Sequence, residues 1–129
     1  MIKIKLHHFA YNIKPNTLET FLEIFKLLWC KLSYRESKKW CMVAQDKVNI
    51  DIQIIETENK NINIDEKIKT HIAFLSDDPK KDIEKIEFFA FNNKLNFQKW
   101  GWNDKEFWFD FTDIFNNFVV EIMHTSVVE

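Results

Sequence analysis

The sequence predicts an α+β fold made of two copies of a βαβββ unit, within one domain that spans residues 1–129. A strand pattern, an amphipathic helix and further strands occur in that order twice along the chain. One polar stretch, residues 57–66, lies between the two copies and has the composition of a connector. We therefore place the units at about residues 2–58 and 67–126.

Short repeated segments support the same division. The sequence His-Phe-Ala-Tyr at residues 8–11 recurs as His-Ile-Ala-Phe at residues 71–74. Likewise Ile-Gln-Ile-Ile at residues 52–55 recurs as Val-Glu-Ile-Met at residues 120–123. The first pair opens each unit and the second pair closes it, so both repeats stand at equivalent places in the predicted order of elements.

In the first unit, polar and apolar residues alternate over residues 2–8, which is a strand pattern. The segment Asn-Thr-Leu-Glu at residues 16–19 is typical of a capping box, and apolar residues at helical spacing behind it predict a helix over residues 17–32. Strands are expected at residues 40–44 and 48–56, with a tight turn between them.

In the second unit, residues 69–75 predict a strand, and Asp78 followed by Pro79 predicts the start of a helix that ends near Asn92. Gly101 and the pair Asn103-Asp104 indicate a turn between the next two strands. The remaining strands are expected at residues 95–100, 106–112 and 118–124.

Composition excludes several classes of protein. A net charge of −2 with mixed signs gives no basic surface for nucleic acid or for an anionic membrane. No apolar run approaches the length of a membrane span, and the first residues do not have the pattern of a signal peptide. The two cysteines have neither disulfide-framework nor zinc-site spacing, so we expect a cytoplasmic protein in which Cys30 and Cys41 are buried, unreactive thiols.

The chain resembles the glyoxalase/bleomycin-resistance/dioxygenase (vicinal oxygen chelate) superfamily. The resemblance covers most of the sequence and rests on short motifs: the His-x-Ala-x opening of both units, Phe-Asp-Phe-Thr-Asp at residues 109–113, and Val-Val-Glu-Ile at residues 119–122. It implies a glyoxalase-like fold in which a curled mixed sheet surrounds a cavity. It also implies metal ligands from the first and fourth strands of each unit, namely His8, Gln53, His71 and Glu121.

Strand alternation agrees with this assignment, because His8 shares a face with Ala10 and the repeat pairs His71 with His8 rather than with His7. Two imidazoles, a carboxylate and an amide oxygen suit one divalent ion, and Zn, Ni, Co, Mn and Fe remain open. The other interpretation is a pair of hydrogen-bonded core histidines. Gln53 could equally satisfy local hydrogen bonds, which would leave two histidines and one carboxylate.

Several further residues have two interpretations. Glu106, Trp108 and Asp110 alternate with phenylalanines, so they either face a ligand, with acids suited to proton transfer, or lie solvated on an edge strand. Trp100 and Trp102 either form a wall of a substrate pocket or belong to the core. The expected pocket residues are therefore Trp100, Trp108 and Asp110. His7 and His124 are expected at the surface.

Three functions follow as hypotheses. The first is a metal-dependent, glyoxalase-like lyase or isomerase that acts on a small molecule with vicinal oxygens, with Glu121 as the group that moves a proton. The second is a metal-free binding protein of the bleomycin-resistance type, which would hold an aromatic or cationic compound among tryptophans. A regulatory domain with a degenerate pocket is a third. The expected partner is a small molecule rather than nucleic acid or membrane, and a homodimer is left open.

Overall fold

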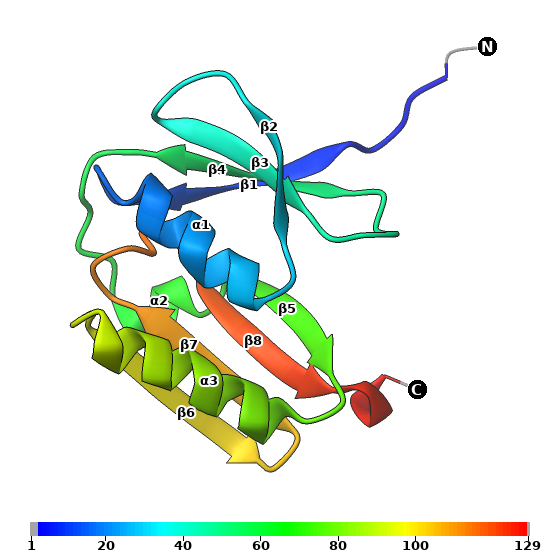
Figure 1. Cartoon of the computed structure of the whole chain (residues 1–129), viewed down its shortest axis with the longest axis vertical. Helices are drawn as coiled ribbons and strands as arrows, with labels where there is room; N and C mark the ends of the chain where they lie inside the picture. Colours follow the sequence, from blue (N-terminus) through cyan, green and yellow to red (C-terminus); the bar gives the residue numbers. More distant parts are fainter. Residues whose placement is uncertain (1–2, 129) are drawn as a thin grey trace. The chain divides into compact units, whose positions relative to one another are not determined.

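The computed structural model describes residues 3–128, and the chain divides into two compact units between Asn59 and Lys60 (Figure 1). Each unit contains one four-stranded mixed sheet with a helix packed on it. The predicted α+β class and the order strand, helix and three strands in both units are confirmed. Among the described residues, no helix has the length and apolar character needed to cross a bilayer.

The first unit contains one helix and four strands. The sheet order is β1-β4-β3-β2, in which β1 runs parallel to β4 and the other pairs are antiparallel. The elements are β1 (His8–Ile13), α1 (Leu18–Leu27), β2 (Lys31–Arg35), β3 (Trp40–Ala44) and β4 (Asp51–Glu56).

The second unit repeats this arrangement after a short additional helix. Its sheet order is β5-β8-β7-β6, again with the first and last strands parallel. The elements are α2 (Ile64–Lys67), β5 (His71–Ser76), α3 (Pro79–Asn92), β6 (Phe97–Asn103), β7 (Glu106–Phe111), β8 (Val119–His124) and the 3-10 turn η1 (Thr125–Val127).

One face of each sheet packs against the long helix of its own unit. In the first unit the core contains Phe21 and Phe25 of α1 together with Cys41, Val43 and Ile54 of the strands, all nearly or fully buried. In the second unit Ile83, Ile86 and Ala90 of α3 are buried, as are Phe109, Phe111, Val120 and Ile122 of the sheet. Because strand residues alternate, the predicted site residues lie on the opposite face of each sheet.

Helix α3 begins and ends as predicted. The Asp78 side chain accepts a hydrogen bond from the Lys81 N–H at 3.2 Å, and Pro79 occupies the first turn, where its missing N–H costs nothing. A local capping signal therefore determined this boundary without help from the rest of the fold.

The predicted first strand is wrong in position. Residues 3–7 form no strand, and β1 begins only at His8, which pairs with Asp51 of β4. Ile4 and Leu6 are largely exposed, so their alternation does not bury an apolar face. Residue 2, which belonged to the same prediction, lies outside the described residues.

The first helix is shorter than predicted, and a strand in the same stretch was missed. Helix α1 ends at Leu27, because Trp29 adopts a left-handed conformation with φ of 64°. The chain then turns into β2, whose Leu32 was assigned to the helix from its spacing. The spacing of the apolar residues did not indicate this helix end, because the residue in the left-handed conformation is a tryptophan rather than the usual glycine.

The predicted capping box at residues 16–19 is also wrong. The first N–H of the helix, that of Leu18, donates to the Glu56 carboxylate of β4 at 3.1 Å. The Glu19 carboxylate instead lies 2.6 Å from the Arg35 guanidinium. A residue distant in sequence thus satisfies the helix start, which the local motif could not indicate.

Smaller differences concern the connector and the strand ends. The connector predicted over residues 57–66 contains the start of α2, capped by the Asn63 side chain. Gly101 lies inside β6 rather than at a turn, and a side chain there would meet the Glu106 carbonyl oxygen at 2.8 Å. The first and last strands of the second unit begin slightly later than predicted, as does the strand expected over residues 48–56.

Candidate functional site

His71 and Glu121 form a close pair on the face of the second sheet that α3 leaves open. They lie on the parallel neighbours β5 and β8, where His71 pairs with Val119 and Ala73 pairs with Glu121. The two side chains therefore belong to adjacent rows of one face. The His71 Nε2 atom lies 4.0 Å from the Glu121 Oε1 atom, which is too long for a hydrogen bond.

The ring of His71 is held in one orientation by the backbone. Its Nδ1 atom lies 3.0 Å from the Ile68 carbonyl oxygen. A carbonyl only accepts, so Nδ1 carries the proton and donates it to Ile68. When the ring is neutral, it presents the Nε2 lone pair on the side of Glu121, which is the arrangement that metal-binding histidines need.

Glu121 is a buried carboxyl group, only 7% exposed. Burial raises the pKa of Glu121, nearby His71 lowers this pKa, and Glu106 raises it again. No N–H or O–H group in residues 3–128 donates a hydrogen bond to its carboxylate. The group is thus desolvated and beside a lone pair, a setting in which it either keeps a proton or binds a cation.

Trp108 of β7 lies next to this pair. It is paired with Glu121 across the strands, and its ring meets that of His71 edge to face at 4.7 Å between centroids. Trp108 is 9% exposed, and within the described chain its indole N–H has no hydrogen-bond partner. A buried donor without a partner costs about 1–3 kcal/mol, so this one is available to an acceptor that enters the site.

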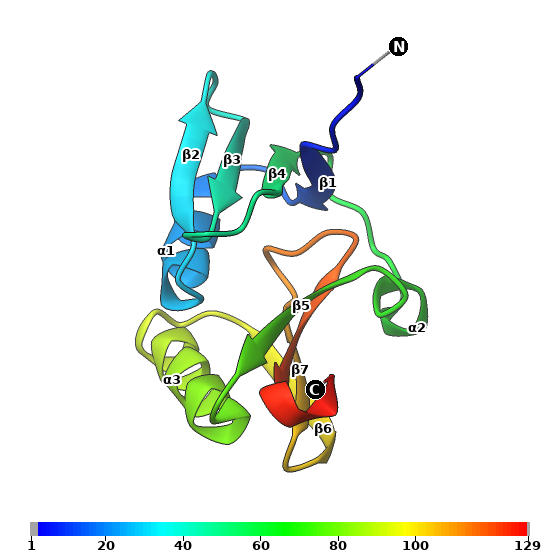
Figure 2. The same cartoon turned by 90° about the vertical axis from the view of Figure 1, so that its right-hand side faces the viewer.

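One interpretation of the sequence placed Asp110 on a solvated edge strand, and this interpretation is wrong. Strand β7 is an inner strand, and Asp110 is 2% exposed. Both of its carboxylate oxygens lie 2.9 Å from the Lys67 ammonium of α2, which is 5% exposed. Figure 2 shows α2 on the side of this sheet away from α3. Because Asp110 is neutralised by Lys67, it is poorly suited to proton transfer.

The first unit places His8 and Gln53 on equivalent strands, where Gln53 is less buried than Glu121 and His8 is less exposed than His71. Gln53 is paired with Ala10 and His8 with Asp51, so both side chains lie on the face opposite α1. Both are half-buried. The Nδ1 atom of His8 lies 3.0 Å from the Nδ1 atom of exposed His7, and the described residues offer no hydrogen-bond partner to the Gln53 amide.

Neither unit alone holds three metal-binding side chains together among its described residues. The structure brings His71 close to Glu121, and places His8 and Gln53 on one face of the other sheet. Whether all four bind one ion stays a prediction.

The other residues named from the sequence differ in how far they are exposed. Trp100 is half-buried beside Trp108, whereas Trp102 is 71% exposed and is not a core residue. The His124 side chain is half-exposed and accepts a hydrogen bond from the Ser126 N–H. Burial raises the pKa of the Cys30 thiol to about 12 and that of Cys41 to about 11, so both are unreactive as predicted.

Sequence reasoning missed Lys67 and the role of Ile68. Lys67 lies in a polar stretch where a lysine is normally solvated, and only its contact with Asp110 on a distant strand shows otherwise. The Ile68 carbonyl acts through the backbone, which no side-chain pattern reports.

Comparison with known proteins identifies the fold. No protein-family model and no curated protein matches the sequence. Among solved structures, a possible glyoxalase from Bacillus cereus has a TM-score of 0.58 and 11% identity, covering 94% of this chain and 99% of its own. The fosfomycin resistance protein FosX from Listeria monocytogenes, complexed with Mn(II) and sulfate, has a TM-score of 0.58 and 15% identity, covering 96% and 91%.

A third similar structure is TnmS3, an antibiotic binding protein from Streptomyces sp. CB03234. Its TM-score is 0.54 at 10% identity, and the match covers 96% of this chain and 98% of that one. Similarity at this level of identity concerns the fold, and proteins with one fold carry out different functions. The protein therefore has the fold of the vicinal oxygen chelate superfamily.

Proposed function

We propose that this protein is a divalent-metal-dependent enzyme that acts on a small molecule with two neighbouring oxygen atoms, as a lyase or isomerase. The observation that carries the proposal is the His71–Glu121 pair, in which a fixed imidazole lone pair and a desolvated carboxylate oxygen lie 4.0 Å apart. Two donors that are each about 2.1 Å from one ion lie roughly 3.0–3.4 Å from each other, so a small movement of either side chain is sufficient.

His8 and Gln53 are proposed to complete the ligand set with a second imidazole and an amide oxygen. Such a mixed nitrogen and oxygen set suits Zn, Ni, Co, Mn or Fe, and the similar FosX structure contains Mn(II). A bound cation of this kind supplies Lewis-acid stabilisation of an enolate or alkoxide oxygen.

Glu121 is proposed to move the proton. A carboxylate that leaves the cation can accept a proton from the substrate and can return it when it binds the cation again. The unpaired indole N–H of Trp108 is proposed to donate to a substrate oxygen beside it. Asp110 is assigned a structural role, because Lys67 holds both of its oxygens.

A metal-free binding protein is the second candidate, and one observation favours it. The edge-to-face contact between His71 and Trp108 forms an aromatic surface with an unused hydrogen-bond donor. Such a surface binds a planar ligand through stacking and one polar contact, without any ion. The similar TnmS3 is described as an antibiotic binding protein.

Metal titration separates the two candidates first. We expect the protein purified without a metal-affinity tag or chelator to bind one Mn(II) or Zn(II) per chain, measured by calorimetry after removal of bound metal. The matched variants are His71→Ala, which should weaken the binding by roughly 100-fold or more, and His124→Ala, which should leave it unchanged because His124 lies outside the proposed set. Binding that is equal in both variants, or absent in the wild type, would contradict the metalloenzyme.

Two substitutions then test the role of Glu121. In an enzyme, Glu121→Gln should abolish turnover yet retain much of the ligand affinity, since an amide keeps an oxygen donor but cannot accept a proton. In a binding protein, Trp108→Ala should be the more damaging change, because it removes the ring beside His71. Both variants are to be titrated with any ligand found by thermal-shift screening. Unchanged turnover in Glu121→Gln would eliminate the proton-transfer role.

A further inference from the structure

His7 and His8 form a close contact at the start of β1, which the sequence did not indicate. The side chains of adjacent strand residues lie on opposite faces, and on that basis His7 was expected only at the surface. The two rings nevertheless meet edge to face, with 5.2 Å between their centroids and 88° between their planes. Their Nδ1 atoms lie 3.0 Å apart, which is a hydrogen-bond distance.

One ring must donate in this hydrogen bond and the other must accept. A neutral imidazole has one N–H donor and one lone pair, so the two rings have different tautomers. If His8 donates through Nδ1, its Nε2 atom carries a lone pair, and if His8 accepts, its Nε2 atom carries the proton. Because Nδ1 is occupied in both cases, only the first arrangement leaves His8 a nitrogen that can bind a metal.

The surroundings of the two rings favour His8 as the donor. His7 is exposed, so water accepts from its Nε2–H group, whereas His8 is half-buried and the described residues offer its Nε2 atom no hydrogen-bond partner. An N–H group without a partner is costly where burial excludes water. The His7 backbone is held as well, because its carbonyl oxygen accepts a hydrogen bond from the Asp51 N–H at 2.9 Å. The acceptor therefore belongs to a fixed part of the sheet.

The second unit satisfies the equivalent histidine with a different group. The Nδ1 atom of His71 lies 3.0 Å from the Ile68 carbonyl oxygen, which can only accept. His8 begins β1 as His71 begins β5, and its Nδ1 atom meets a side-chain nitrogen at the same distance. Each histidine of the repeat thus has an acceptor for Nδ1, from the backbone in one unit and from a side chain in the other.

We infer that His7 is a positioning residue for the proposed metal site: its Nδ1 atom accepts from the His8 Nδ1–H group and so selects the tautomer in which the His8 Nε2 lone pair is available to the ion. The inference rests on the proposed function for the presence of the ion, but the tautomer is already selected in the metal-free chain. Supporting groups of this kind contribute about 10–100-fold to metal affinity, and we expect the lower end because His7 is exposed.

Two substitutions of His7 test the inference through metal affinity. Asparagine carries an oxygen acceptor at the place of Nδ1 along the side chain, and leucine has a similar shape without any polar atom. His7→Leu should weaken Mn(II) binding about tenfold in calorimetry, whereas His7→Asn should keep most of the wild-type affinity. Equal affinity of these two variants would overturn the inference.

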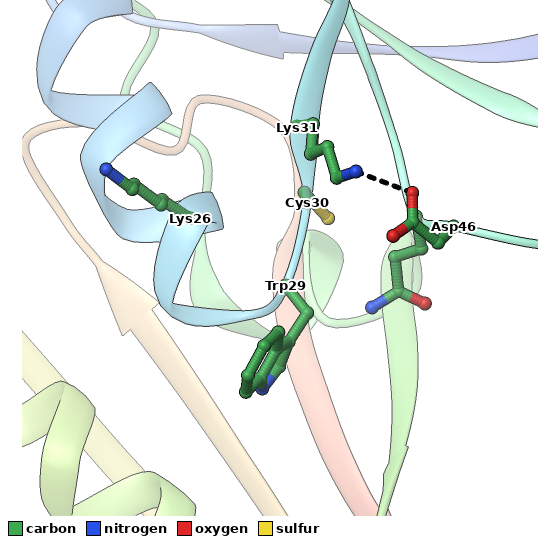
Figure 3. A pocket seen from close by; sticks show the side chains of 6 residues that line it. Lys26, Trp29, Cys30, Lys31 and Asp46 are labelled. Atoms are coloured by element: carbon green, nitrogen blue, oxygen red, sulfur yellow. Dashed lines mark ion pairs between the residues drawn. The ribbon is translucent and has the colours of Figure 1, made fainter.

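Lys26→Gln is the control for a surface change in the same unit. Lys26 belongs to α1, whereas His8 lies on the face of the sheet opposite α1. It lines a hollow of about 470 Å³ where α1 ends and β2 begins, and Figure 3 shows its ammonium directed away from Trp29 and Lys31. Mn(II) affinity should therefore be unchanged in Lys26→Gln, and a tenfold loss here as well would overturn the inference.

The tautomer is read separately, from metal-free protein, by NMR correlation spectra of the imidazole nitrogens. At about pH 8.5, where free imidazole is neutral, His8 should carry its proton on Nδ1 in the wild type and in His7→Asn, and should lose this preference in His7→Leu. A wild-type His8 with its proton on Nε2 would overturn the inference. Absence of Mn(II) binding together with a proton on Nδ1 would contradict the proposed function instead, and would leave the selection of the tautomer by His7 in place.

Discussion

The two units have the same topology but differ in how far their candidate ligands are prepared for chemistry. In the second unit, Glu121 is buried and His71 is held by the Ile68 carbonyl. In the first unit, His8 and Gln53 are half-buried, and the His8 ring lies against its exposed neighbour His7. The repeated fold thus determines where each candidate metal-binding side chain lies on the sheet. The surrounding residues determine the protonation and the orientation of that side chain.

The buried ion pair between Lys67 and Asp110 is a second contrast, because the Lys31–Asp46 and Arg35–Glu19 pairs of the first unit are exposed or partly exposed. A helix that precedes the repeat, α2, contributes the buried lysine. The second unit is therefore a βαβββ repeat with an additional anchored segment, and its open sheet face is more enclosed as a result. This difference can be tested at several levels.

The largest effect is expected from Lys67→Met. It leaves the Asp110 carboxylate buried without its ammonium partner, which typically costs about 3–5 kcal/mol of unfolding free energy. Urea unfolding measures the loss. Lys69→Met is the control, since it breaks the exposed Lys69–Glu66 pair and should cost less than about 1 kcal/mol. Combining Lys67→Met with Asp110→Leu should restore most of the stability, and equal losses in the two single lysine variants would contradict a buried role.

The next effect concerns metal affinity and compares the units directly. His71→Ala removes an oriented imidazole and should weaken Mn(II) binding by roughly 100-fold or more, since even supporting residues are worth about 10–100-fold. Gln53→Ala removes a candidate ligand of the first unit and should weaken Mn(II) binding by on the order of tenfold. Calorimetry on both variants provides the comparison. A larger loss for Gln53→Ala would reverse the ranking of the two units.

Trp108→Phe should raise stability slightly. The phenyl ring keeps the contact with His71 but removes the buried N–H that has no partner among the described residues, which favours the variant by about 1 kcal/mol in urea unfolding. Trp100→Phe, at the half-buried neighbour on β6, is the control and should give no gain. If Trp108→Phe is destabilising, the indole N–H has a partner in solution.

The smallest effect is a pH-dependent one at Glu121. Burial raises the pKa of Glu121 in the folded chain, so its favourable contribution is present at acid pH and is lost as the pH rises through that raised value. Glu121→Gln cannot ionise, and its thermal midpoint should therefore exceed that of the wild type near neutral pH but not at acid pH. Metal-free protein is required, with exposed Glu84→Gln as the control. A constant difference across the pH range would exclude this linkage.

The α+β class, the repetition of the unit, the start of α3 and the face on which the candidate ligands lie follow from the sequence alone. These depend on short-range features, namely strand alternation and the Asp78 and Pro79 capping signal. The predicted ends are wrong where the deciding contact is distant in sequence or unusual in residue type. The Glu56 carboxylate satisfies the start of α1, and Trp29 ends that helix in a conformation that usually needs glycine.

In the candidate site too, some features were predicted from the sequence and others were shown only by the tertiary structure. The repeat identified His71 and Glu121 as equivalent to His8 and Gln53, because equivalent strand positions share a letter pattern. Only tertiary structure decided that Ile68 fixes the His71 tautomer, that Lys67 neutralises Asp110, and that the Trp108 indole is left without a partner among the described residues. The physical reason is that alternation specifies the direction of a side chain, whereas burial and hydrogen bonding depend on which distant groups the fold brings beside it.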